Sequence, residues 1–127
     1  MKDIFNNAKT VSAIVPAVKS AAADGITVDT RGFNGVLFVV STGAIVSDGD
    51  FGLAVEESDE SSANFGTPAS GLVQSNAPST LEASTTYRIG YTGSKRYVRL
   101  QLTKAGGTSI ALGAVAVLGY PAVAPVA

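Results

Sequence analysis

Short runs of β-branched and aromatic residues alternate with clusters of Gly, Asp, Asn, Ser and Pro from residue 25 onward. This pattern is typical of an all-β domain, in which each run is a strand and each cluster a turn. The runs predict seven strands, at residues 26–29, 36–41, 51–57, 72–74, 85–91, 96–103 and 110–118. We therefore expect a single compact β-sandwich or jelly-roll-like domain over residues 25–120.

Two of these runs are apolar on both sides. Because neighbouring side chains of a strand point to opposite faces, such a run predicts burial of both faces and a central position in a sheet. The first run has Val36, Phe38 and Val40 on one side and Leu37 and Val39 on the other. The second, residues 110–118, carries mostly small residues on both sides, which predicts close contact with neighbouring backbone.

The segment 85–103 predicts a β-hairpin with a four-residue loop at 92–95. In this register Ile89 lies opposite Val98 on an apolar face, and Arg88 lies opposite Arg99 on the other face. Two like charges directly across a ladder are unfavourable unless an anion meets them. The hairpin therefore predicts a basic face that binds an acidic surface.

Two connections frame the predicted strands. A tight turn is expected at Asn34-Gly35, because both residue types accept positive φ, with Arg31-Gly32 as the alternative turn. Residues 57–83 are mostly Ser, Ala, Gly, Thr, Asn and Pro. A compact domain tolerates so long a connection only if it covers something or lies against a neighbour.

The two ends of the chain fall outside the strand pattern. Residues 1–24 contain too little apolar surface to fold alone, so we expect an extended N-terminal arm that becomes ordered on another surface. Pro121 and Pro125 end the last strand, and residues 121–127 are expected to form an extended C-terminal tail.

The chemical inventory of the 127 residues argues against an enzyme. The chain has no Cys and no His, which removes disulfides, thiolate nucleophiles, imidazole bases and most zinc, haem and iron–sulfur sites. The acids between residues 48 and 60 lack the spacing of a helix–loop–helix calcium loop. We expect no catalytic residue, no metal and no cofactor.

Charge is sparse and unevenly placed. Only 15% of the residues are charged and the net charge is −1, which argues against binding to nucleic acid, and no apolar run is long enough to cross a membrane. Residues 48–60 hold six acids and no base, and residues 88–104 hold five bases and no acid. Within one molecule the two segments could face each other; between copies they could join acidic edge to basic edge in a ring; or the basic segment could meet another acidic surface.

Five segments resemble small proteins of tailed-phage and prophage head modules: residues 1–3, 28–33, 55–59, 89–99 and 116–121. The most specific of them is Gly-Tyr-x-Gly-x-Lys-Arg-Tyr-Val-Arg at residues 90–99. These proteins are similar to capsid decoration, or cement, proteins, which bind the outside of an icosahedral shell, often as trimers near threefold axes. The resemblance implies a virion protein assembled in the host cytoplasm, whose partners are the major capsid protein and further copies of itself.

On this interpretation the arm crosses neighbouring capsid subunits and the charged segments select the partner surface. The expected contact residues are Lys2, Lys9, Lys19, Glu56, Glu57, Asp59, Arg88, Arg96, Tyr97 and Arg99. A head–tail adaptor or a tail-tube subunit is the alternative within the same class. A secreted carbohydrate-binding module is a more distant one, because the chain has no Trp to stack on a sugar. No nucleic acid, membrane or small-molecule substrate is expected as a partner.

Overall fold

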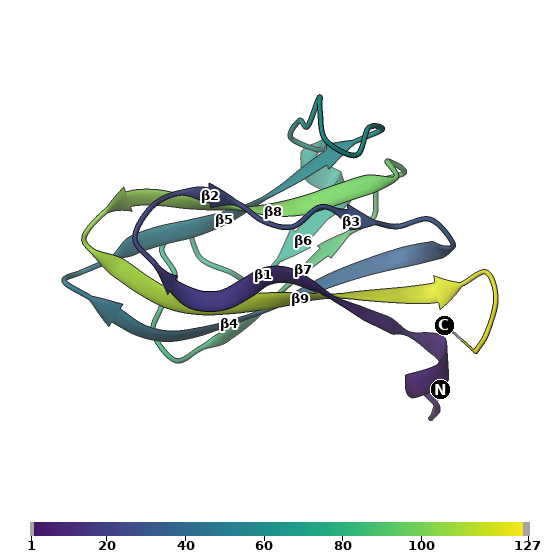
Figure 1. Cartoon of the computed structure of the whole chain (residues 1–127), viewed down its shortest axis with the longest axis horizontal. Coiled ribbons are helices and arrows are strands. Elements are labelled where there is room, and N and C mark those ends of the chain that lie inside the picture. The colour runs from purple at the N-terminus through teal and green to yellow at the C-terminus, as the bar shows by residue number, and fades with distance from the viewer. Residues whose placement is uncertain (1, 126–127) are drawn as a thin grey trace.

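The computed structural model describes residues 2–125, which form a sandwich of two antiparallel β-sheets (Figure 1). The strands are β1 (Lys9–Lys19), β2 (Ala23–Asp24), β3 (Val28–Asp29), β4 (Phe33–Val46), β5 (Asp50–Ser58), β6 (Val73–Ser75), β7 (Thr86–Tyr91), β8 (Tyr97–Gly106) and β9 (Ser109–Pro121). Two short 3₁₀ turns, η1 (Phe5–Asn7) and η2 (Ser70–Leu72), complete the described elements. The all-β class expected from the alternation of residues is confirmed.

The strand order is that of a jelly roll. One sheet, here called the five-stranded sheet, has the order β1-β9-β4-β7-β6. In the other, here called the β8 sheet, β8 lies between β5 on one side and β2 and β3 on the other. The pairs β1·β9, β2/β3·β8 and β4·β7 are nested along the chain, so the chain forms a long antiparallel ribbon that folds over into two layers.

All seven expected strands are present, but two further strands lie in the segment expected to be a free arm. β1 pairs along the whole middle of β9, from Lys9 opposite Leu118 to Lys19 opposite Ile110. Two register shifts and Pro16 interrupt its alternation, as is common in edge strands. The arm expectation is therefore wrong for residues 9–19, and the domain begins at β1 instead of at residue 25.

The N-terminal arm and the C-terminal tail are both shorter than expected. Before β1, the described part of the arm consists of residues 2–8, and Met1 lies outside the described residues. At the other end β9 continues through Pro121. Residues 122–125 follow it, and Val126 and Ala127 lie outside the described residues.

The turn before β4 forms at the alternative position. The Phe33 amide donates to the Thr30 carbonyl over 3.0 Å, and Gly32 has a φ of 89°, a conformation that favours glycine. Asn34 and Gly35 lie inside β4. The expectation of a turn at Asn34-Gly35 is therefore wrong, and the turn lies at Arg31-Gly32.

The expected hairpin of residues 85–103 does not form. β7 pairs with β4 and β6 in the five-stranded sheet, whereas β8 belongs to the other sheet. The connection at residues 92–96 crosses from one layer to the other, so the buried side chains of Ile89 and Val98 face the same core from opposite sheets. Alternation predicted correctly which side chains point inward, but it carries no information on which strands pair.

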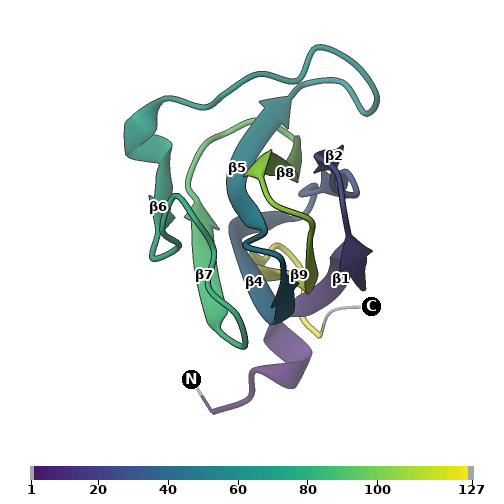
Figure 2. The same cartoon turned by 90° about the vertical axis from the view of Figure 1, so that its left-hand side faces the viewer.

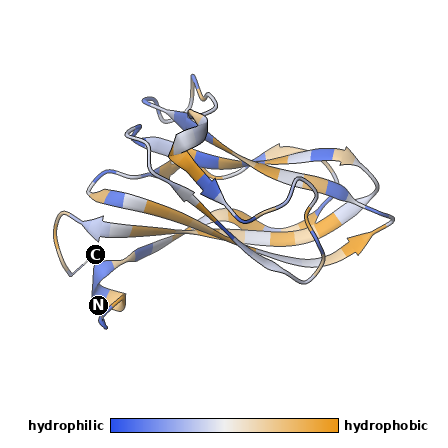
Figure 3. Cartoon of the chain, turned by 180° about the vertical axis from the view of Figure 1, so that it is seen from behind, coloured by the Kyte–Doolittle hydropathy of each residue, from blue (hydrophilic) through white to orange (hydrophobic). Residues whose placement is uncertain are grey.

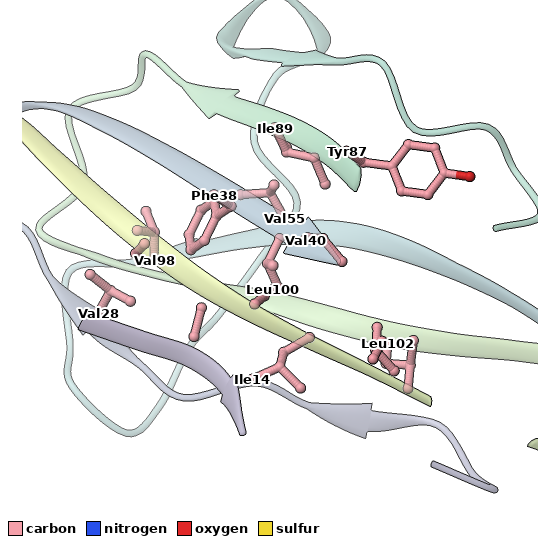
Figure 4. Close-up of a cluster of buried hydrophobic side chains, with 14 of the residues drawn as sticks. Ile14, Val28, Phe38, Val40, Val55, Tyr87, Ile89, Val98, Leu100 and Leu102 are labelled. Atoms are coloured by element: carbon pink, nitrogen blue, oxygen red, sulfur yellow. The ribbon is translucent and has the colours of Figure 1, made fainter. Parts of the chain in front are cut away.

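The core lies between the two sheets (Figure 4). It includes Val36, Phe38 and Val40 of β4 together with Val98 and Leu100 of β8. Phe51, Leu102, Ile110 and Leu118 are also buried. Each large apolar side chain that is buried in this way contributes roughly 1.5–3 kcal/mol.

The long connection between β5 and β6 covers the free edge of β5 (Figure 2). Gly66 of this connection exchanges two backbone hydrogen bonds of 2.9 Å with Glu57, and in the next connection, between β6 and β7, the Leu81 amide donates to the Phe51 carbonyl over 2.8 Å. The Leu81 side chain is buried. In Figure 3 the hydrophobic colour runs along the strands, whereas this connection is mainly pale or blue. Its low hydrophobicity is thus compatible with order, because its backbone pairs with the sheet edge.

Candidate interaction surfaces

The outward side of the five-stranded sheet is apolar. Phe38 of β4 and Ala116 of β9 are opposite one another and buried, so their neighbours in register point outward. These neighbours are the pairs Leu37–Val117 and Val39–Val115. Val18 of β1 continues the surface, opposite Ala111. We call this surface, made by Val18, Leu37, Val39, Ala111, Val115 and Val117, the apolar face.

A groove with a volume of about 640 Å³ runs across one half of the apolar face. It is lined by β1, β4 and β9, including Pro16, Val18, Val39, Ala111 and Val115, and none of its lining residues is charged. Val18 is 69% exposed and Val115 is 42% exposed. Contiguous exposed apolar surface of this kind marks a site of interaction more often than a solvated face.

The sequence predicts that the residues of this face are buried, but it does not indicate that they form an interaction site. The run 36–41 predicted burial on both sides. In a single chain only one side is covered, because the β8 sheet packs on the inner side alone and Leu37 and Val39 stay half-buried. The second apolar side of β4 is therefore left for a partner. Of the ten expected contact residues, only Arg88 lies on this sheet face. It is opposite Val39 in the register of β4 and β7.

The outward side of the β8 sheet is charged and internally paired. Arg99 Nε donates to Glu56 Oε1 over 2.8 Å, and an Arg99 terminal nitrogen lies 3.5 Å from Asp24 Oδ2. The guanidinium of Arg99 also lies over the ring of Phe65, 4.0 Å from its centroid. We call this surface, which includes Asp24, Glu56, Arg99 and Gln101, the charged face.

Two further ion pairs border the charged face. Lys95 Nζ donates to Asp59 Oδ2 over 2.6 Å, and Arg96 makes two 2.8 Å hydrogen bonds to the two carboxylate oxygens of Asp29. The Arg96 guanidinium lies 4.9 Å from the centroid of the Tyr97 ring. These contacts leave the expected contact residues Arg96, Tyr97 and Asp59 engaged within their own chain.

The segregated charges therefore meet within one molecule. β5 carries the acids and β8 the bases, and the two strands are neighbours with Glu56 opposite Arg99. The basic face expected to unite Arg88 with Arg99 is wrong, since the two residues lie on different sheets. Of the three interpretations of the charge pattern, only the one in which the acidic and basic segments face each other within one molecule needs no partner. The ion pairs that it requires are present in the structure.

Hydrogen bonding and burial shift two pKa values in this region. Hydrogen bonds from Arg96 lower the pKa of Asp29 to about 2. Burial, assisted by a hydrogen bond to Glu57, raises the pKa of Tyr91 to about 12. The Tyr91 hydroxyl donates to Glu57 Oε1 over 2.6 Å and accepts from the Lys95 amide over 3.2 Å. Glu57, another expected contact residue, is thus held by Tyr91 of β7, which belongs to the opposite sheet.

The three lysines of the expected arm are separated by β1. Lys2 precedes η1 and is exposed, and Lys9 and Lys19 begin and end the strand. Lys19 lies opposite the buried Ile110, so the two ends of β1 present cations at opposite ends of the sheet.

The acids of the described residues do not gather into a cluster. Within residues 2–125 no group of three or more acids, His or Cys is arranged to hold a metal ion. The acids of β5 and its flanks are dispersed: Asp50 accepts from Thr80 and Glu60 accepts from Asn64. In the same range no helix is both long and apolar enough to cross a membrane.

Comparison with known proteins adds no relative: no family model matches the chain, and no curated protein matches it. The surfaces described above and the resemblance of residues 90–99 and the other short segments are therefore the indications of function.

Proposed function

We propose that this protein is a capsid decoration, or cement, protein that binds the outer surface of a tailed-phage head and bridges its subunits. The observation that carries the proposal is the apolar face, which a single chain leaves uncovered on a sheet whose other side is fully packed. A protein that leaves an apolar sheet face uncovered, with no charged residue lining its groove, is suited to permanent burial against partners. The resemblance to phage head-module proteins supplies the identity of the shell.

The proposed mechanism is shared burial. Apolar surface removed from water contributes roughly 25 cal/mol per Å², so each copy that spans two capsid subunits adds a contact that expansion of the shell must break. Repetition over the lattice multiplies a modest interface by avidity. The charged face, whose side chains already satisfy one another, points away from the shell in this arrangement.

The test is to mix the purified protein with undecorated phage heads, pellet the particles and image them by electron microscopy. We expect ordered density over the outer lattice and greater resistance of the heads to heat than without the protein. Heads already saturated with the protein serve as the control, because they should take up no more. Density confined to the portal vertex or the tail would instead assign the protein to the adaptor or tube class.

A further inference from the structure

β7 contains a glycine that its own backbone and packing do not require. Gly90 has Leu37 of β4 opposite it on one side and Gln74 of β6 on the other, and neither pairing contains a register shift. Its φ is not positive, and a Cβ added there would meet no atom closer than the Gln74 carbonyl oxygen, at 3.9 Å. A single chain would therefore accept alanine or a larger residue at position 90.

Two other strand glycines have a packing reason that Gly90 lacks. A Cβ at Gly52 would lie 2.8 Å from the Ser79 carbonyl oxygen, and one at Gly35 would lie 3.0 Å from the ring of Tyr120. Glycine weakens a strand, and it usually marks a bulge, a tight bend or a place that a ligand or another backbone approaches closely. At Gly90 no bulge and no close backbone of the same chain is present, so the approach of a partner is the remaining reason for glycine.

A hollow of about 220 Å³ lies at Gly90 on the outward side of the five-stranded sheet. It adjoins the apolar face at Leu37, and it shares no lining residue with the groove. Because sites for drug-sized ligands have volumes of roughly 300–1,000 Å³, this hollow suits a smaller group such as one side chain. We call it the Gly90 socket, and its lining residues are Leu37, Gln74, Ser75, Asn76, Arg88 and Gly90.

The polar side chains of the Gly90 socket favour an anion. Arg88 points to the same side of β7 as Gly90, because the two residues are two positions apart. None of the ion pairs within residues 2–125 includes Arg88, and no acid lines the socket. Asn76 Oδ1 accepts from the Arg88 amide over 2.8 Å, so the group that Asn76 can still offer to a ligand is its Nδ2 donor.

The lining of the socket indicates which anion it binds. Leu37 and the bare backbone of Gly90 offer an apolar part next to the guanidinium of Arg88. A guanidinium binds a carboxylate through two parallel hydrogen bonds, so a carboxylate on a short apolar stem matches both parts. A nucleic acid is a poor match, because the lining supplies one cation and neutralises at most one phosphate.

We propose that the Gly90 socket receives a glutamate or aspartate side chain of the partner that covers the apolar face, with its carboxylate on Arg88 and its stem over Gly90 and Leu37. The inference rests on the proposed function, in which that partner is a capsid subunit, and deepens it by naming the group that is recognised. A partner without this carboxylate would bury Arg88 unpaired, which is unfavourable. The socket therefore contributes specificity, whereas the apolar face contributes buried area.

The first experiment fills the socket. Gly90→Val should keep the free energy of unfolding at least at the wild-type value, since valine is favoured in strands, but should weaken binding to phage heads by about tenfold or more. Gly90→Ala, which adds a single methyl group, should show a smaller loss of binding. Gly106→Val is the matched control, because Gly106 is a glycine of β8 at which a Cβ also meets no atom within 4 Å. A folded Gly90→Val variant that binds heads as tightly as the wild type would overturn the proposal.

The second experiment tests for the carboxylate by changing both partners. Surface carboxylates of undecorated heads are converted to neutral amides with a carbodiimide and methylamine, and binding to modified and unmodified heads is compared. Amidation should weaken the wild type several-fold but Arg88→Ala by less than about twofold, because both changes remove the same contact. Arg31→Ala, which removes an exposed cation outside the socket, should respond to amidation as the wild type does. Equal losses for the wild type and Arg88→Ala, or no loss for the wild type, contradict the assignment.

A third measurement needs no heads. Butyrate, a carboxylate on a short apolar chain, should shift the backbone amide resonances of Gly90 and Asn76 in the full chain with a Kd of about 10 mM, as expected of a small contact. Uncharged butyramide should cause no such shift, and Arg88→Ala and Gly90→Val should lose the response to butyrate. The absence of a saturable shift up to about 0.1 M butyrate, or an equal shift with butyramide, refutes the socket.

The outcomes separate this inference from the proposed function. Heads that are decorated equally by the wild type and by Gly90→Val refute the socket and leave the decoration proposal intact. A protein that binds butyrate at Gly90 and Asn76 as expected but does not bind heads refutes decoration alone.

Discussion

The two outward faces of the sandwich are built on the same backbone pattern and have opposite chemistry. On the charged face, the bases of β8 lie beside the acids of β5, and Arg99 has contacts with Glu56, Asp24 and Phe65. On the apolar face, Val39 and Val115 are neighbours with no polar group between them. The first face is complete within one chain, whereas the second still exposes surface of the kind that forms the core. The comparison indicates which side of the molecule is adapted to a partner.

Glycine also distinguishes the apolar face. A Cβ at Gly113 of β9 would lie 2.7 Å from Cγ of Pro16, so only glycine allows β1 to approach at this point. The close approach explains the small residues of β9, from which nearby backbone is expected on both faces. It also keeps the floor of the groove low, because Ala111, Gly113 and Val115 project little from the sheet.

The largest expected effect comes from placing the same charge on each face. Val115→Asp should weaken binding to phage heads by about 100-fold or more, because burying an unpaired carboxylate in an apolar contact costs several kcal/mol. Thr103→Asp, at an exposed position of β8, should change binding by less than about threefold. Sedimentation of heads with each variant measures the effect. Similar losses for both variants would remove the distinction between the faces.

A smaller effect should separate Arg88 and Arg99, which the expected hairpin places opposite each other. Arg99→Ala should lower the free energy of unfolding by about 2 kcal/mol, because it leaves the half-buried Glu56 without its partner, and should leave head binding unchanged. Arg88→Ala should have the opposite pattern of effects. The free energy of unfolding should change by less than about 0.5 kcal/mol, whereas binding to heads should weaken several-fold. Urea denaturation and head sedimentation measure the two quantities, and Arg31→Ala is the control for loss of an exposed cation. Loss of head binding in Arg99→Ala with unchanged stability would favour the charged face as the contact surface.

The smallest effect is expected at the border of the charged face and depends on pH. The pKa of Asp29 is lowered to about 2 in the folded protein, so its pair with Arg96 stabilises the fold fully above the ordinary pKa of 3.8. That contribution is lost as the pH falls toward 2. Asp29→Asn should therefore lower stability at neutral pH by less than about 1 kcal/mol and flatten its decline between pH 4 and pH 2, because the pair is exposed. Acid titrations of the unfolding free energy should show an unchanged slope only if the pair contributes nothing.

Alternation of residues predicted the side chains of the core but not the partners of the strands. Val36, Phe38 and Val40 were assigned to the core from their spacing, and they are buried. The hairpin of residues 85–103 was assigned because its strands are consecutive and have matching faces. In the structure the same matching faces meet across the core, since two sheets of a sandwich require apolar sides that face each other as much as two strands of one sheet do.

β1 shows a second limit. Its apolar residues are interrupted by Pro16 and by two register shifts, so no period-2 pattern marks it as a strand. Its place is determined by β9, whose small side chains accept a close neighbour, and by the need to pair the free edge of that strand. An irregular edge strand is recognisable only once its partner is known.

The sequence by itself determined the all-β class, the positions of seven strands, the inward side of most of them and the absence of Cys and His from the chemical inventory. Only the tertiary structure decided that acids and bases neutralise one another on one face and that the second apolar side of β4 stays open on the other. The physical reason is that a local alternation specifies a direction for each side chain, whereas burial and ion pairing depend on which distant strand is packed there. The interaction surface belongs to this second group, because it is defined by the layer that a single chain does not supply.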